Sequence, residues 1–109
     1  MATRQELLQE EVRELTDLLR NEADFQDLRE ILTDKGMQVS ETVLAGLIGS
    51  EDGSQYGVFL TSGIQCIRFE TAPNGLLAKW EIINDPNALA SDFEAVPAGI
   101  SMIRNGEIS

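Results

Sequence analysis

The stretch TVLAGLIGSEDGSQYGVFLTSGIQCIRFETAPNGLLAKWEII, residues 42–83, decides the fold. It is rich in β-branched and aromatic residues, and turn-forming residues interrupt it at similar intervals. Asp52-Gly53 is a strong hairpin signal, Ser62-Gly63 is a weaker one, and Pro73-Asn74-Gly75 indicates a longer turn. The predicted strands span about 42–50, 55–61, 64–71 and 76–83. Because the connections are short, neighbouring strands are expected to be antiparallel.

The positions of the turns also predict which side chains share a face of the sheet. A turn at 52–53 puts Leu47 opposite Val58, and a turn at 62–63 puts Val58 opposite Ile67. A connection over 72–75 then puts Ile67 opposite Trp80. Because side chains alternate between faces, these registers predict one nearly continuous apolar face. Its expected members are Val43, Ala45, Leu47, Tyr56, Val58, Leu60, Ile67, Phe69, Leu76, Ala78, Trp80 and Ile82.

The opposite face is predicted to be mixed. Its apolar members are Leu44, Ile48, Phe59, Ile64, Cys66 and Ile83, and its charged members are Arg68, Glu70, Lys79 and Glu81. In the predicted register Arg68 faces Lys79 and is diagonal to Glu81.

Helices are predicted on both sides of the meander. Residues 4–35 carry an apolar stripe with helical spacing that weakens at 21–24. Two helices over about 4–20 and 24–35 are favoured, and a single long helix stays open because no Gly or Pro interrupts the segment. Asp85-Pro86 is a good helix start, and Pro97 is expected to end that helix. Residues 98–104 fit either a strand or another helical turn.

The chain of 109 residues is therefore expected to be one α+β domain. The predicted order is two N-terminal helices within 4–35, a four-stranded antiparallel meander over 42–83, and a short C-terminal helix within 85–104. The N-terminal helices are expected to cover the apolar face. The C-terminal segment or a second subunit would cover the apolar part of the mixed face.

Charge restricts the possible partners. The chain has 19 acidic and 8 basic residues, a net charge of −11 that is spread along its length. Phosphate backbones and anionic membranes are bound by clustered Lys and Arg, so neither nucleic acid nor a membrane is an expected partner. The N-terminal residues lack the apolar core of a signal peptide, and Cys66 is the sole cysteine, so a cytoplasmic location is expected.

The residues for most enzyme chemistry are missing. There is no histidine, and no glycine-rich phosphate-binding motif occurs. We therefore expect no cofactor, no metal and no enzymatic activity, with a carboxylate- or metal-dependent enzyme as an unfavoured alternative. Glu6, Glu10 and Glu14 step along one side of the first helix and are interpreted as a solvated face.

The expected function is that of a non-enzymatic acidic module that binds a basic protein partner, as an adaptor, an inhibitor, an immunity-type protein or a chaperone-like protein. The predicted contact with a partner, or with a second copy in a homodimer, comprises Leu44, Phe59, Ile64, Cys66 and Ile83. The alternative function is a small-ligand sensor or carrier. Its cavity would lie between the sheet and the helices, near Tyr56, Phe69 and Trp80.

Overall fold

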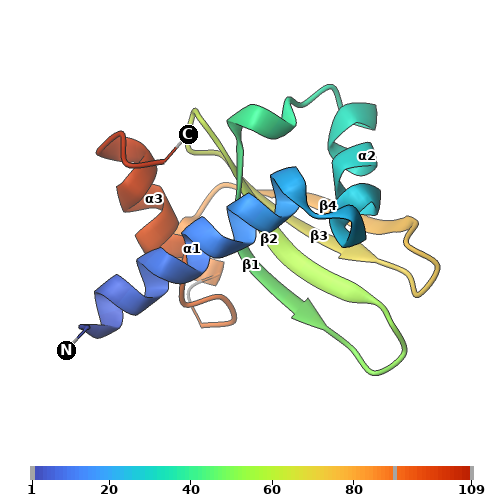
Figure 1. Ribbon diagram of the computed structural model, residues 1–109, viewed down its shortest axis with the longest axis horizontal. Helices are drawn as coiled ribbons and strands as arrows, with labels where there is room; N and C mark the ends of the chain where they lie inside the picture. Colours follow the sequence, from blue (N-terminus) through green and yellow to red (C-terminus); the bar gives the residue numbers. More distant parts are fainter. Residues whose placement is uncertain (1, 90, 109) are drawn as a thin grey trace.

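A four-stranded antiparallel sheet in the order β1-β2-β3-β4 organises the molecule (Figure 1). The computed structural model describes residues 2–89 and 91–108. The helices are α1 (Arg4–Asn21), α2 (Gln26–Asp34) and α3 (Val96–Arg104), and the strands are β1 (Thr42–Gly49), β2 (Gln55–Thr61), β3 (Cys66–Thr71) and β4 (Leu77–Ile83). Short 3-10 turns occupy Ala23–Phe25, Val39–Glu41 and Pro86–Leu89. The predicted α+β layout is confirmed.

The N-terminal segment forms two helices, as predicted. Thr3 caps α1 by accepting a hydrogen bond from the amide of Glu6 at 3.1 Å. No Gly or Pro stops α1, but Arg29 of α2 turns back towards its end. The Arg29 guanidinium donates to the carbonyl oxygens of Leu19 at 2.8 Å and Glu22 at 2.7 Å. This side chain satisfies carbonyls that have no partner within α1 and stabilises the sharp turn between the helices.

The C-terminal segment differs from the prediction. Pro86 begins only a short 3-10 turn, and Pro97 lies in the first turn of α3 instead of ending a helix. Proline suits this position because the first amides of a helix have no intrahelical acceptor and its fixed φ is already helical. Residues 98–104, for which strand and helix were both open, are helical. Ala90, which falls within the predicted helical segment, lies outside the described residues.

The three hairpins share one kind of loop, which changes the predicted registers. Backbone hydrogen bonds pair 50 with 54, 61 with 65 and 72 with 76, so each loop has three residues. The third residue of each loop has a positive φ: Gly53 (93°), Ile64 (63°) and Gly75 (85°). The predicted loops of two, two and four residues were therefore each wrong by one. A shift of one residue moves a side chain to the other face of the sheet.

The predicted continuous apolar face is consequently wrong. Val58 pairs with Arg68, whereas Ile67 pairs with Phe59, so Val58 and Ile67 lie on opposite faces. Trp80 pairs with Phe69 and not, as predicted, with Ile67. Irregularities in pairing lie between Leu44 and Gly46 and between Glu70 and Thr71. Each face thus takes about half of the predicted apolar set.

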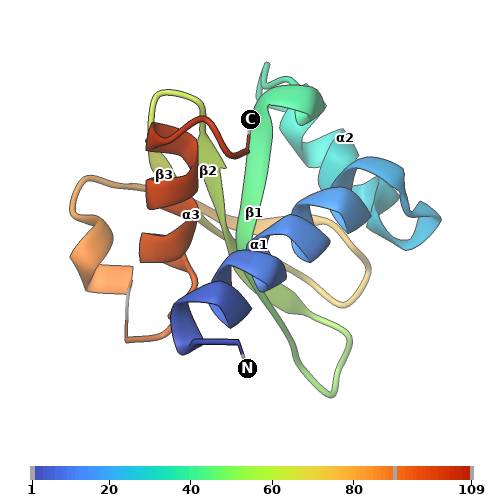
Figure 2. The same ribbon diagram turned by 60° about the vertical axis from the view of Figure 1, so that its left-hand side comes forward.

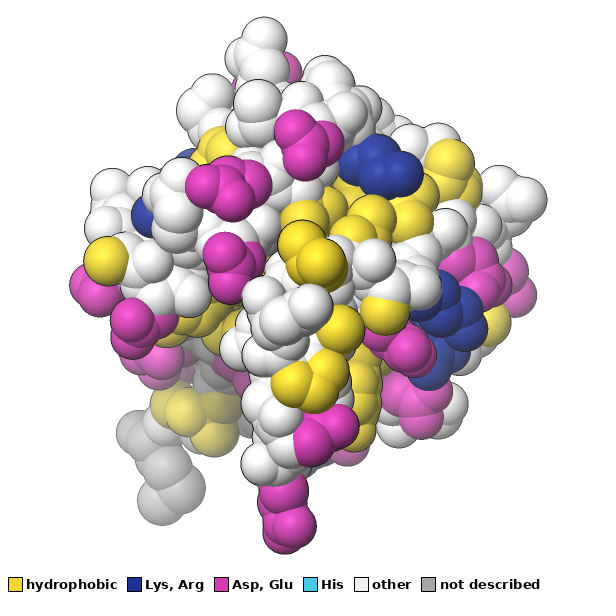
Figure 3. Space-filling view, turned by 90° about the vertical axis from the view of Figure 1, so that its right-hand side faces the viewer, with side chains coloured by type: hydrophobic (Ala, Val, Ile, Leu, Met, Phe, Trp, Pro, Cys, Tyr) yellow, Lys and Arg dark blue, Asp and Glu magenta, His cyan; other side chains and the backbone are white. Residues whose placement is uncertain are grey.

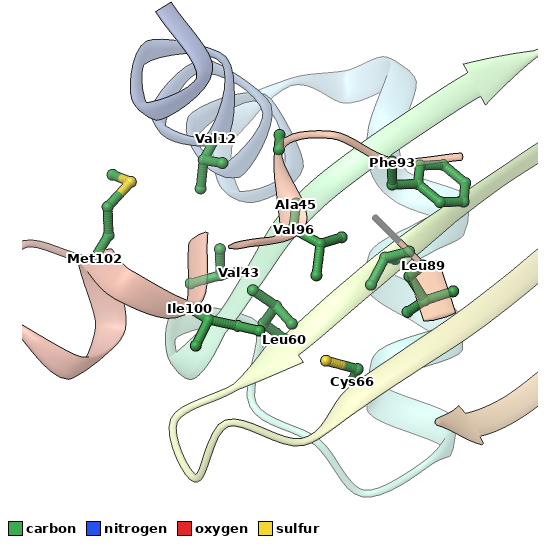
Figure 4. Packing of buried hydrophobic residues seen from close by; sticks show 12 residues of the cluster. Val12, Val43, Ala45, Leu60, Cys66, Leu89, Phe93, Val96, Ile100 and Met102 are labelled. Atoms are coloured by element: carbon green, nitrogen blue, oxygen red, sulfur yellow. The ribbon is translucent and has the colours of Figure 1, made fainter. Parts of the chain in front are cut away.

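Both faces of the sheet are covered, each by a different helix (Figure 2). The cluster under α3 includes Val43, Ala45, Val58 and Leu60 from the sheet and Val96, Ile100 and Met102 from the helix (Figure 4). The cluster under α2 includes Leu44, Phe59, Ile67 and Phe69 from the sheet and Leu28, Ile31 and Leu32 from the helix. Helix α1 contributes to both clusters, with Val12 in the first and Leu19 in the second.

The two edges of the sheet differ. At β1, the hydroxyl oxygen of Thr16 in α1 accepts a hydrogen bond from the Leu44 amide at 3.1 Å. Arg20 of α1 donates to the Thr42 carbonyl at 3.0 Å. At the other edge, β4 has β3 as its one strand neighbour within residues 2–89 and 91–108. Helix α1 therefore hydrogen-bonds to the first part of the β1 edge, and in the described part of the chain the β4 edge is open to a further strand.

Candidate protein-contact site

The five residues predicted as a contact surface divide between the two faces of the sheet, with Leu44 paired to Phe59 on one face and Cys66 paired to Ile83 on the other. Leu44 and Phe59 are fully buried under α2, and Cys66 is buried under α3. Ile64 and Ile83 are half-buried against the α3 cluster. Burial raises the pKa of the Cys66 thiol, which fits the interpretation of this residue as a small buried hydrophobe.

Of the three residues predicted to surround a ligand cavity, Phe69 and Trp80 are cross-strand partners and Tyr56 lies on the other face. Phe69 is fully buried, and its ring stacks on Phe59 with centroids 4.3 Å apart. Trp80 lies on the same face, 6.1 Å from the Phe59 ring. Tyr56 packs against the α3 cluster on the opposite face. These aromatic side chains are therefore part of the packing and do not surround a common space.

A different feature, a hollow between α2 and the loop joining β3 to β4, brings together chemically distinctive side chains. The apolar side of α2 faces the sheet, which leaves Asp27, Glu30 and Asp34 exposed. Their spacing of three and four residues places the three carboxylates along one side of the helix. The sequence contains this spacing, but it does not show which part of the sheet the carboxylates lie beside.

The loop over 73–75 forms the opposite wall of the hollow. Asn74 accepts a hydrogen bond from the amide of Leu76 at 3.1 Å, which fixes the exit from the turn. Gly75 has φ of 85°, and a Cβ at this position would lie 2.3 Å from a carboxylate oxygen of Asp27. The backbone conformation therefore favours glycine, and a larger residue here would also displace the Asp27 carboxylate from its place beside the loop.

The hollow has an apolar base and an acidic rim. It has a volume of about 160 Å³ and is lined by Asp27, Glu30, Ile31, Asp34, Lys35, Asn74, Gly75, Leu76 and Leu77. Leu76 is 67% exposed at its margin. The one cation of the lining, Lys35, places its Nζ 5.2 Å from the centre of the Trp80 ring. Figure 3 shows acidic side chains on either side of gathered apolar ones on the face that contains the β1–β2 and β3–β4 loops.

The size and chemistry of the hollow favour contact with one side chain of another molecule. Its volume of about 160 Å³ is below the roughly 300–1,000 Å³ of small-molecule sites. Among the described residues, no group of three His, Cys, Asp or Glu side chains is close enough together to hold a metal ion. Three carboxylates and one ammonium group leave the lining negative overall.

Compared with protein-family models, with curated proteins and with solved structures, the chain matches none of them. Of the helices formed by residues 2–89 and 91–108, none combines the length and the apolar character needed to cross a bilayer. The fold and the geometry of the hollow are therefore the basis for a functional proposal.

Proposed function

We propose that the protein is a non-enzymatic binding module that takes a basic side chain of a partner protein into the hollow between α2 and the β3–β4 loop. The observation that carries this proposal is the acidic rim, Asp27, Glu30 and Asp34, around an apolar base that includes Ile31. Lys and Arg have long apolar stems and charged heads, so they match such a site along their whole length. The rim would bind the head, and the apolar base would contact the stem.

A protein partner is favoured over a free cation because an apolar side chain borders the hollow. Leu76 is 67% exposed at the margin, and a partner would cover it with an apolar residue next to its Lys or Arg. The net charge of −11 would also speed the approach of a basic partner by electrostatic steering. An adaptor, an inhibitor, an immunity-type protein or a chaperone-like protein could each use such a site.

The test compares two variants with the same change in net charge. Asp27→Asn/Glu30→Gln/Asp34→Asn neutralises the rim, and the control Glu6→Gln/Glu10→Gln/Glu14→Gln neutralises three exposed acids on α1. The probes are short peptides with one central Lys or Arg between apolar residues, and glutamine-centred versions serve as negative probes. The fluorescence of Trp80, the single tryptophan, reports binding because Lys35 of the hollow lies over its ring.

We expect the rim variant to bind the basic peptides about tenfold more weakly and the α1 variant to bind them nearly as well as the wild type. Equal weakening by both variants would show that only net charge matters. Equal binding of the glutamine-centred peptides would show that the rim does not select a cation. Either result would contradict the proposal.

A further inference from the structure

The open edge of the sheet carries a charge pattern that is complementary to itself. Strand β4 presents Lys79, Trp80 and Glu81 in its middle, and Lys79 and Glu81 lie on the same face. Trp80 is half-buried, and Ile82 is 51% exposed beside it. We propose that β4 pairs antiparallel with β4 of a second copy across a two-fold axis at Trp80, so that two sheets join into one. This proposal does not depend on the hollow.

A two-fold axis at Trp80 puts Lys79 opposite the partner's Glu81, and Glu81 opposite the partner's Lys79. The next strand extends this pattern, because Glu81 already pairs with Arg68 and Lys79 with Glu70 within one copy. On the α3 face the joined sheet therefore has a row of alternating sign: Arg68, Glu81, the partner's Lys79 and the partner's Glu70. Opposite charges that face each other across strands stabilise pairing, and like charges destabilise it.

The neighbouring registers do not have this match. An axis at Lys79 would put Lys79 opposite the partner's Lys79, and an axis at Glu81 would put two glutamates opposite each other. Of these three registers, only the one centred on Trp80 joins opposite charges. Among these three registers, the pattern thus favours pairing with a second copy about an axis at Trp80.

The other face of the joined strands is apolar at the same point. Trp80 would lie beside the partner's Trp80, on the face where it pairs with Phe69 of β3. Aromatic side chains that face each other across strands contribute to sheet stability. The charges of Lys79 and Glu81 cancel, so the contact itself does not add to the repulsion between two acidic copies.

Sedimentation velocity at high micromolar concentration tests the proposal with charge variants. We expect the wild type to form a species of twice the monomer mass of 12.0 kDa. Lys79→Glu and Glu81→Lys would each place two like-charge pairs in the dimer and raise its dissociation constant about tenfold or more. An equimolar mixture of these two variants would restore the dimer, because opposite charges face each other again. Glu10→Lys, on exposed α1, has the same change in net charge as Glu81→Lys and is its control.

A wild type that stays monomeric would overturn the proposal. So would a mixture of the two variants that stays monomeric while circular dichroism shows both to be folded. A dimer that is indifferent to both substitutions would show that the contact lies elsewhere.

Cysteine crosslinking tests the register. In a Cys66→Ala background, Trp80→Cys places a thiol opposite its own copy, at a Cα separation of about 5.5 Å that a disulfide spans. Ile82→Cys is the matched control, since the two thiols would be four residues apart along the strands, about 13 Å. Under mild oxidation we expect a covalent dimer from the variant at position 80 and little from the variant at position 82. The reverse result would overturn the register at Trp80.

Discussion

The hydrogen bond from the Leu44 amide to Thr16 can be removed with little change in the shape of the core. Thr16 is 2% exposed, and its hydroxyl oxygen lies 3.1 Å from the Leu44 nitrogen. Thr16→Val replaces the hydroxyl with a methyl group and leaves a buried N–H without an acceptor. An unsatisfied buried donor costs about 1–3 kcal/mol. We expect the free energy of unfolding to fall by about that amount.

Thr16→Ser is the matched control, because it keeps the acceptor and removes one buried methyl group, at a cost of about 1 kcal/mol. Urea unfolding measures the stability of both variants, and amide hydrogen exchange measures the protection of Leu44. Protection at Leu44 should fall in the valine variant and persist in the serine variant. A valine variant as stable as the wild type, with Leu44 still protected, would refute the conclusion that this bond stabilises the contact between α1 and β1.

Three further predictions concern the core and are each measured by urea unfolding. Gly57→Ala should lower the free energy of unfolding by about 1–3 kcal/mol or more, because its Cβ would lie 2.3 Å from a carbonyl oxygen of β1. Gly49→Ala is the control, since a Cβ there meets nothing within 4 Å, and equal losses in the two variants would contradict this prediction. A double-mutant cycle of Phe59→Leu and Phe69→Leu should give a coupling of about 0.5–1.5 kcal/mol, since the rings stack 4.3 Å apart, and additive losses would exclude a specific contribution of the stacking. Burial raises the pKa of the Cys66 thiol, so as pH rises the unfolded chain loses this proton first. The contribution of the buried, protonated thiol to the free energy of unfolding is therefore complete below the thiol pKa of the unfolded chain and is lost as the pH approaches the raised value. The Cys66→Ala variant should show no such loss.

The order of elements could be predicted because its signals are local. Apolar residues at helical spacing predicted α1 and α2, and turn-forming residues divided the four strands correctly. The exact loops could not be predicted, because the sequence suggests a different turn from the one that forms. Ser62-Gly63 suggests a two-residue turn, whereas the residue with positive φ is Ile64, a type that rarely adopts this conformation.

That one-residue difference explains why the predicted residues of the two faces are wrong, although a cover for each face was expected. It moves Ile67 and Phe69 of β3 to the face opposite Val58, so both faces need a cover. Helix α3, in the C-terminal segment, supplies the second cover, and Pro97 lies in its first turn instead of ending a helix. The candidate hollow depends on the same tertiary arrangement. The acid spacing on α2 is visible in the sequence, but its approach to Gly75 is not.

The two edges of the sheet would have different roles in the proposed dimer. Charged residues on an open strand hinder pairing with most other strands, so Lys79 and Glu81 would oppose mismatched contacts while matching a second copy. Helix α1 hydrogen-bonds to Thr42 and Leu44 of β1, so in a dimer joined through β4 each outer edge of the joined sheet would have α1 beside its first residues. The axis of the dimer would run perpendicular to the sheet and would keep both α2 helices on one side. Both acidic hollows would then face the same way, and a partner with two suitably spaced basic residues would bind the dimer more tightly than a single copy.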